Sequence, residues 1–100
     1  MVDREKSIGA LREMYPRPRV GQWVKLRKNS RRAEVVTVLK ARDVLKGMTE
    51  MQALMMGPRC QALYGVFWLD IYYEAVVRVP GAMMQQTVTP VDVEAIVDPP

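Results

Sequence analysis

The residue types that most enzymes use for catalysis are scarce in this sequence. The 100 residues include no histidine and one cysteine, Cys60. Without histidine, one chain cannot form a Ser/His/Asp triad, a Cys/His dyad or a zinc finger. Cys60 follows Arg59, whose charge would favour a reactive thiolate, but we favour the alternative of a small buried side chain. We therefore expect no catalytic activity, no bound metal and no cofactor.

The acidic residues and the glycines form no recognisable catalytic or phosphate-binding motif. Asp70 and Glu74 are four residues apart, which places them on one face of either a helix or a strand, so the spacing does not identify an acid/base pair. Two solvent-facing charges explain it equally well. The six glycines are spread singly along the chain, so no glycine-rich phosphate loop is present.

The basic residues, in contrast, are concentrated early in the chain. Residues 1–46 contain 13 of the 15 Lys and Arg residues and 5 of the 11 Asp and Glu residues, which gives them a net charge of +8, whereas residues 47–100 carry −4. Residues 14–33 contain seven basic residues and no acidic one. Such a local charge attracts phosphates or an acidic protein surface. The alternative is an ordinary solvated face.

Composition indicates one globular domain over residues 1–100, because 49% of the residues are hydrophobic and 26% are charged. No stretch approaches the ~18 uncharged apolar residues of a membrane span. Charged residues at positions 3–6 exclude a secretory signal at this point of the chain. Together with the lone cysteine, this predicts a cytoplasmic protein.

The first half of the chain predicts a helix followed by a hairpin. A helix within residues 1–16 is ended by Pro16 and Pro18. Residues 19–40 then form a basic β-hairpin, with strands at about 20–28 and 33–40 joined by Asn29-Ser30. In the first strand Val24 and Leu26 point to one face, and Trp23, Lys25 and Arg27 to the other.

The second half predicts a helical insertion at 41–65 and the remaining strands at 66–97. The insertion contains a helix over 43–56, which Gly57-Pro58 ends. Four methionines lie in this helix, and we favour a core face over a partner-binding groove. Residues 66–79 alternate as a strand that must bend near Asp70 or Glu74, with a buried helix as the alternative. A Pro80-Gly81 turn, a strand at 84–89, a helical turn at 90–93 and a strand at 94–97 follow.

This order of elements resembles an SH3-like small β-barrel with the layout of KOW and Tudor modules. The resemblance covers residues 19–97 apart from 41–65, and its cues are Val20-Gly-Gln-Trp-Val-Lys and Val88-Thr-Pro-Val-Asp-Val. It implies an α+β, mostly β fold: an antiparallel barrel with an N-terminal helix and an inserted helix near 43–56. It also implies nucleic-acid binding.

Two functions from different classes remain open at this point. The first is a non-catalytic module that binds the phosphate backbone of nucleic acid through a basic and aromatic hairpin face. The residues assigned to that face are Arg17, Arg19, Trp23, Lys25, Arg27, Lys28, Arg31 and Arg32. The second is a protein-interaction module, encoded by a phage or another mobile element, that docks an acidic partner or forms a homodimer through its acidic half or its methionine stripe.

Overall fold

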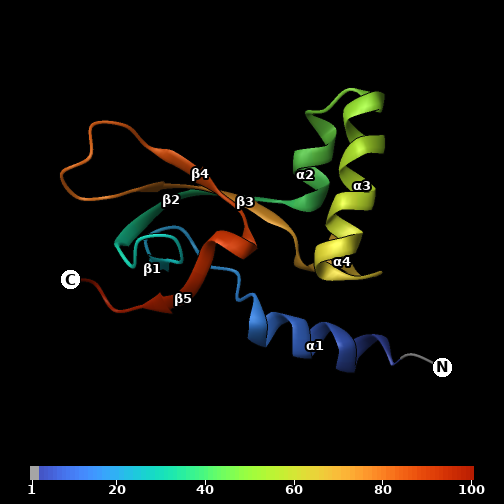
Figure 1. Ribbon diagram of the computed structural model, residues 1–100, viewed down its shortest axis with the longest axis horizontal. Helices are drawn as coiled ribbons and strands as arrows, with labels where there is room; N and C mark the ends of the chain where they lie inside the picture. Colours follow the sequence, from blue (N-terminus) through green and yellow to red (C-terminus); the bar gives the residue numbers. More distant parts are fainter. Residues whose placement is uncertain (1–2) are drawn as a thin grey trace.

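An antiparallel β-sheet and a group of helices form opposite ends of the molecule (Figure 1). The computed structural model describes residues 3–100. The strands are β1 (Trp23–Leu26), β2 (Arg32–Lys40), β3 (Tyr73–Arg78), β4 (Gln86–Val88) and β5 (Val93–Val97). They pair in the order β4-β3-β2-β1-β5, and every pairing is antiparallel. The fold is therefore α+β, as predicted, but β4 and β5 remain the two edges and the sheet does not close into a barrel.

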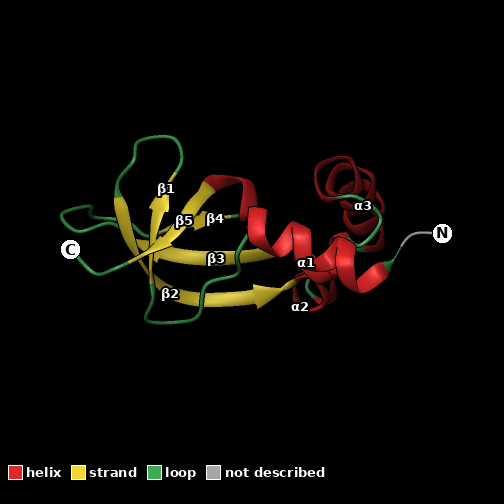
Figure 2. Cartoon of the chain, turned by 90° about the horizontal axis from the view of Figure 1, so that it is seen from below, coloured by secondary structure: helices red, strands yellow, loops and turns green. Residues whose placement is uncertain are grey.

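One face of the sheet is buried, and alternate residues of its three central strands form the core there. Val24 and Leu26 of β1 are buried, as the alternation predicts, and they pack with alternate residues of β3 such as Tyr73 and Val77. The strands bend at two register shifts. One lies between Val35 and Thr37 in β2, and the other lies between Lys25 and Leu26 in β1. Figure 2 shows β2 and β3 running side by side from the sheet toward the helices.

The helices are α1 (Arg4–Met14), α2 (Ala41–Lys46), α3 (Glu50–Tyr64), α4 (Trp68–Ile71) and the 3-10 turn η1 (Pro90–Asp92). A second apolar cluster holds α1, α3 and α4 together through Ile8, Cys60, Tyr64 and Ile71. The side chain of Asp3 caps α1 by accepting a hydrogen bond from the Lys6 N–H (3.2 Å). The predicted first helix, the β1–β2 hairpin, η1 and β5 are thus confirmed, although β1 is shorter than expected.

The helix predicted at 43–56 is wrong in both of its boundaries. The chain forms two helices, because the side chain of Thr49 accepts from the Gln52 N–H (3.2 Å) and that of Gln52 accepts from the Thr49 N–H (3.0 Å), which caps a new helix. Pro58 does not end α3, which continues to Tyr64. Pro58 is exposed, so the carbonyl that loses its N–H partner can bind water instead.

The strand predicted at 66–79 begins only at Tyr73. Residues 68–71 form the short helix α4, which places Ile71 in the helical cluster beside Tyr64. The alternation of apolar residues is compatible with a strand, but packing against α1 and α3 determines the conformation. The turn at Pro80-Gly81 is confirmed: the Ala82 N–H donates to the Val79 carbonyl (3.0 Å), and Gly81 has a φ of 85°.

Candidate nucleic-acid interface

The loop of the β1–β2 hairpin is held by its own backbone hydrogen bonds. The Leu26 N–H donates to the Arg31 carbonyl (2.8 Å), and the Ser30 N–H donates to the Leu26 carbonyl (2.9 Å). The Asn29 side chain accepts from the Arg31 N–H (3.0 Å), and Ser30 takes a left-handed φ of 58°. The loop therefore projects the four basic residues of positions 27–32 from one end of the sheet.

Trp23 lies on the outer face of β1, opposite to the buried core face. The residue is half-buried, and an indole on the outer face of a sheet is the kind of side chain on which a base can stack. Its cross-strand neighbours are Glu34 of β2 and Val97 of β5. Glu34 forms an ion pair with Arg78 of β3 (2.7 Å), so a carboxylate that is already neutralised borders the indole.

Lys25 shares this outer face, and within residues 3–100 it is the one predicted cation with a carboxylate partner. Its Nζ lies 2.9 Å from a carboxylate oxygen of Glu94 in β5. The hydrogen bond from Lys25, together with the charge of Lys25, holds the pKa of Glu94 below its usual range. Glu94 is therefore ionised at neutral pH, and its negative charge offsets the positive charge of Lys25.

Arg17 and Arg19 lie on the segment that leads into β1, which is fixed to the sheet. Pro18 between them is buried. The Arg19 N–H donates to the side chain of Gln22 (2.8 Å), and the Gly21 N–H donates to the Val35 carbonyl (2.9 Å). Both arginines are exposed. They lie at the start of β1, one short strand away from the hairpin loop.

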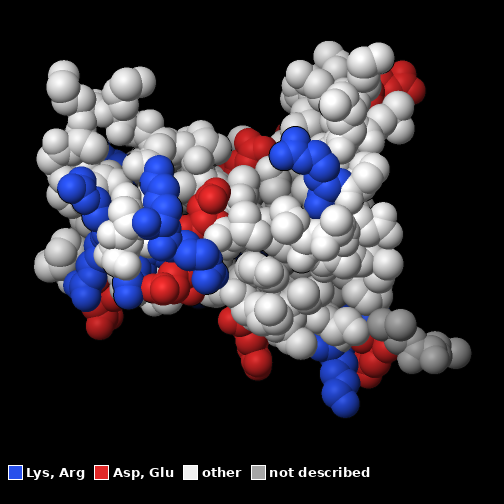
Figure 3. Space-filling view, in the orientation of Figure 1, with Lys and Arg blue, Asp and Glu red and all other residues white. Residues whose placement is uncertain are grey.

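Backbone carbonyls, not carboxylates, accept hydrogen bonds from two of the remaining basic side chains. The Arg27 guanidinium donates to the Val91 carbonyl (3.0 Å), and that of Arg32 to the Asp98 carbonyl (3.5 Å). Neutral carbonyls orient these groups without cancelling their charge. In Figure 3 most of the visible Lys and Arg side chains gather at the sheet end of the molecule, with a few acidic ones among them, while the helical end is mostly uncharged.

Two hollows border the hairpin loop. One, of about 260 Å³, is lined by residues 26–28, 86–88 and 91–92. The other, of about 390 Å³, is lined by residues 31–32, 79–80 and 100. The first hollow lies between Arg27 and Lys28 of the hairpin and strand β4, which follows the β3–β4 connection. The second lies between Arg31 and Arg32 and the beginning of that connection.

The two acidic residues that the sequence analysis considered as an acid/base pair have structural partners. Asp70 forms an ion pair with Arg4 (3.1 Å), and Glu74 accepts a hydrogen bond from the Tyr72 hydroxyl (2.9 Å). Burial raises the pKa of the Cys60 thiol, which therefore stays protonated at neutral pH. Within residues 3–100, no group of three or more His, Cys, Asp or Glu side chains is placed to hold a metal ion. No helix in this range is long and apolar enough to cross a bilayer. Nothing in the described part of the chain indicates catalysis.

Sequence reasoning missed the acidic residues that share this surface. Glu94 and Glu34 are brought to Lys25 and Trp23 by the β1–β5 and β1–β2 pairings. The position of Glu34 beside Trp23 could be predicted from the register of the β1–β2 hairpin, because the two residues are close in sequence. Glu94 is 69 positions from Lys25, so no local sequence signal predicts that pair.

Comparison of the chain with protein-family models, with curated proteins and with solved structures finds no match in any of the three.

Proposed function

We propose that this protein binds nucleic acid through the basic surface around its β1–β2 hairpin. The observation that carries the proposal is that six of the seven basic residues in this region have no carboxylate partner within residues 3–100. These six are Arg17, Arg19, Arg27, Lys28, Arg31 and Arg32. Exposed guanidinium and ammonium groups pair with phosphates and release counterions, and the accessible part of Trp23 adds a stacking surface.

The topology supports the same proposal. The strand order β4-β3-β2-β1-β5 and the 3-10 turn that precedes β5 favour an open form of the SH3-like arrangement that the sequence resembles. We propose a cytoplasmic location for the protein, which is consistent with its single, buried cysteine.

The salt dependence of binding tests the proposal. We expect the affinity for fluorescently labelled single- and double-stranded DNA and RNA, measured by anisotropy, to fall steeply with salt. Six phosphate contacts give a slope of log affinity against log salt of at most about −5 on duplex DNA. The double reversal Arg31→Glu with Arg32→Glu should make this slope less steep by about 2 and weaken binding to all sequences alike.

A matched variant separates the hairpin from the total charge. Lys6→Glu with Arg42→Glu changes the net charge equally, but Lys6 lies on α1 and Arg42 on α2, both exposed. This variant should keep the wild-type slope. An affinity that does not change with salt, or the same loss in both double variants, would contradict binding through the hairpin.

Self-association through α3 is a second candidate function, and one observation favours it. Met51, Leu54 and Met55 on the outer side of α3 are between 66% and 72% exposed, although a helix of this apolar composition normally has its faces covered. The two charged residues of α3 are Glu50, in its first turn, and Arg59. An antiparallel pair of α3 helices from two copies would place the two Glu50 side chains at opposite ends, so like charges stay apart.

Light scattering after gel filtration tests this second candidate. A dimer should form as the protein concentration rises, and Leu54→Glu should prevent it. Met84→Glu, an equal change at another exposed apolar residue outside α3, is the matched control and should leave the dimer intact. A monomer at all concentrations would exclude self-association and leave nucleic-acid binding as the only proposal.

A further inference from the structure

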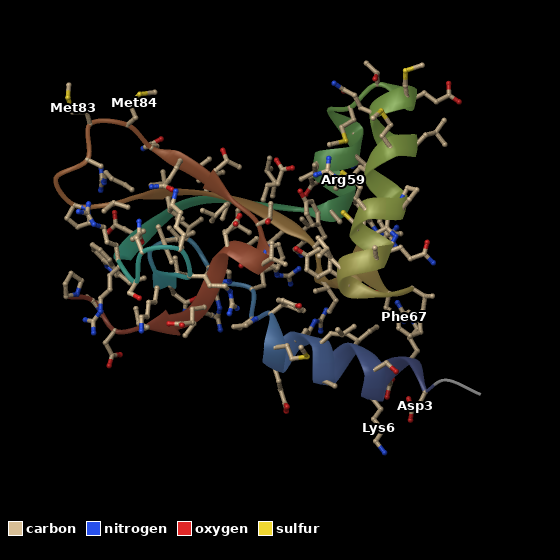
Figure 4. The ribbon with its side chains drawn as sticks, viewed as in Figure 1. Asp3, Lys6, Arg59, Phe67, Met83 and Met84 are labelled. Atoms are coloured by element: carbon tan, nitrogen blue, oxygen red, sulfur yellow. The ribbon has the colours of Figure 1, made fainter. Side chains whose placement is uncertain are left out.

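The connection between β3 and β4 projects two apolar side chains into solvent. Residues 79–85, which we call the β3–β4 arm, begin with the Pro80-Gly81 turn. Met83 is 101% exposed and Met84 is 81% exposed. In Figure 4 both side chains extend outward from the far end of the arm, away from the sheet and from α3. Single exposed apolar residues are common, but two adjacent ones on a projecting loop call for an explanation.

The arm rises directly beside the basic loop of the hairpin. Because β2 and β3 are antiparallel, with Glu34 opposite Arg78, the end of β3 lies beside the start of β2. Residues 79–80 line the same hollow as residues 31–32. Residues 86–88 of β4, which follow the arm directly, line the hollow shared with residues 27–28. Two pairs of basic residues therefore flank the base of an arm whose far end is apolar.

The composition of the arm suits a polyanionic groove. Residues 79–91 contain no charged residue, so the arm itself is not repelled by phosphates. Gln85 follows the two methionines, and Gln86 is the first residue of β4. Glutamine amides can hydrogen-bond the base edges in the minor groove, and an unbranched methionine adapts its shape to a narrow gap.

We infer that Met83 and Met84 form a wedge that enters the minor groove of double-stranded DNA and unstacks one base step. This inference rests on the proposed nucleic-acid binding, and it makes the ligand of the basic surface a duplex that the protein bends. The basic residues on both sides of the arm would contact the phosphates that border the widened groove. Apolar side chains inserted between base pairs kink DNA toward the major groove, and the bent duplex then contacts more of the protein surface.

A lipid surface is the other environment that takes up an apolar loop beside basic residues. Segments that insert into membranes usually carry aromatic or leucine side chains, whereas the arm has none. The paired glutamines next to the methionines are polar groups that base edges satisfy and acyl chains do not. These features favour DNA over a membrane.

Bending and unstacking of a duplex test the inference directly. The probe is a DNA duplex of about 30 base pairs, with donor and acceptor dyes on its ends and 2-aminopurine at a central TA step, which is easily kinked. Full-length wild-type protein should raise both the energy transfer and the 2-aminopurine fluorescence. Met83→Ala with Met84→Ala should abolish both signals and weaken binding by no more than about tenfold, with an unchanged salt slope because no phosphate contact is lost.

Matched variants and vesicles separate the outcomes. Met14→Ala with Val66→Ala removes two exposed apolar side chains outside both the arm and α3 and should bend DNA as the wild type does. Salt-dependent binding without bending, or bending that survives in the Met83/Met84 variant, would overturn the wedge while leaving the proposed function intact. Absence of salt-dependent binding to duplex DNA alone would contradict the wedge, whereas its absence for single- and double-stranded DNA and RNA alike would contradict both. Binding to phosphatidylserine vesicles that requires Met83 and Met84, without DNA bending, would overturn the wedge in favour of a lipid anchor.

Discussion

At the scale of single residues, Glu94 limits the positive charge of the candidate interface. Its carboxylate is the partner of Lys25 at 2.9 Å, and both side chains are partly exposed. An exposed ion pair of this kind adds little to stability, because solvent screens it. If the surface binds nucleic acid as proposed, we expect the pair to compete with phosphates for Lys25. Charge at this position can therefore be changed without disturbing the sheet.

We expect Glu94→Gln to strengthen nucleic-acid binding. The amide releases Lys25, so the salt slope should become steeper by about 1 and the affinity at low salt should rise several-fold. Asp43→Asn is the matched control, because it removes the same charge from the 3.9 Å pair with Lys46 on α2 and should leave the salt slope unchanged. Anisotropy titrations of both variants at a series of salt concentrations make the comparison. Equal effects of the two changes would show that only net charge matters.

The dependence of binding on pH follows from the same pair. The pKa of Glu94 is lowered by Lys25, so the ion pair is present above the unfolded-state pKa and is lost only as the pH falls through the lowered value, in acid. The chain has no histidine, the side chain that ordinarily changes charge near neutrality. Binding should therefore be constant between about pH 6 and 8, in anisotropy titrations at constant ionic strength.

At the scale of secondary-structure elements, Gly65 fixes how α3 passes into α4. Its φ of 83° and ψ of −170° lie in a region that residues with a Cβ avoid. No heavy atom lies within 4 Å of a Cβ built at this position, so a substitution would change the backbone energy alone. The chain direction after α3 therefore depends on this glycine.

We expect Gly65→Ala to lower the free energy of unfolding by about 1–3 kcal/mol. Gly9→Ala is the matched control, because Gly9 lies inside α1, has no such φ and also has open space around its Cβ position. It should raise the free energy of unfolding by about 0.5–1 kcal/mol, since alanine is the better helix former. Urea unfolding followed by circular dichroism measures both. A similar effect of the two substitutions would contradict the conformational role of Gly65.

The elements that the sequence predicts correctly are those fixed by local signals. The β1–β2 hairpin follows from alternation and from Asn29-Ser30, and the first helix from its apolar spacing and from Pro16. The strand predicted over residues 66–72 is wrong, because their alternation fits a strand and only the cluster around Tyr64 makes residues 68–71 helical. The basic residues of the interface form a sequence run and were predictable, whereas the neutralisation of Lys25 by β5 depends on long-range pairing.

At the scale of the whole molecule, the core consists of two apolar clusters of unequal size. The sheet cluster contains ten buried residues, among them Val24, Tyr73 and Val77 at 0% exposure, and spans five strands. The helical cluster contains four buried residues. In α3, only Cys60 and Tyr64 are buried in a helix of 15 residues. Because so few of its residues are buried, we expect α3 to open without unfolding of the sheet.

Amide hydrogen exchange should therefore separate the two ends of the protein. We expect the slowest exchange in β1, β2 and β3, near the rate set by global unfolding, and faster exchange in α3 through local opening. Addition of duplex DNA should protect residues 27–32 and 79–86 and leave α3 unchanged. The Arg31→Glu/Arg32→Glu variant should lose that added protection, because its hairpin no longer attracts phosphates. Protection of α3 that rises with protein concentration in the absence of DNA would instead indicate that two copies pair through this helix. Uniform exchange across both ends of the protein would show that the two clusters unfold as one unit.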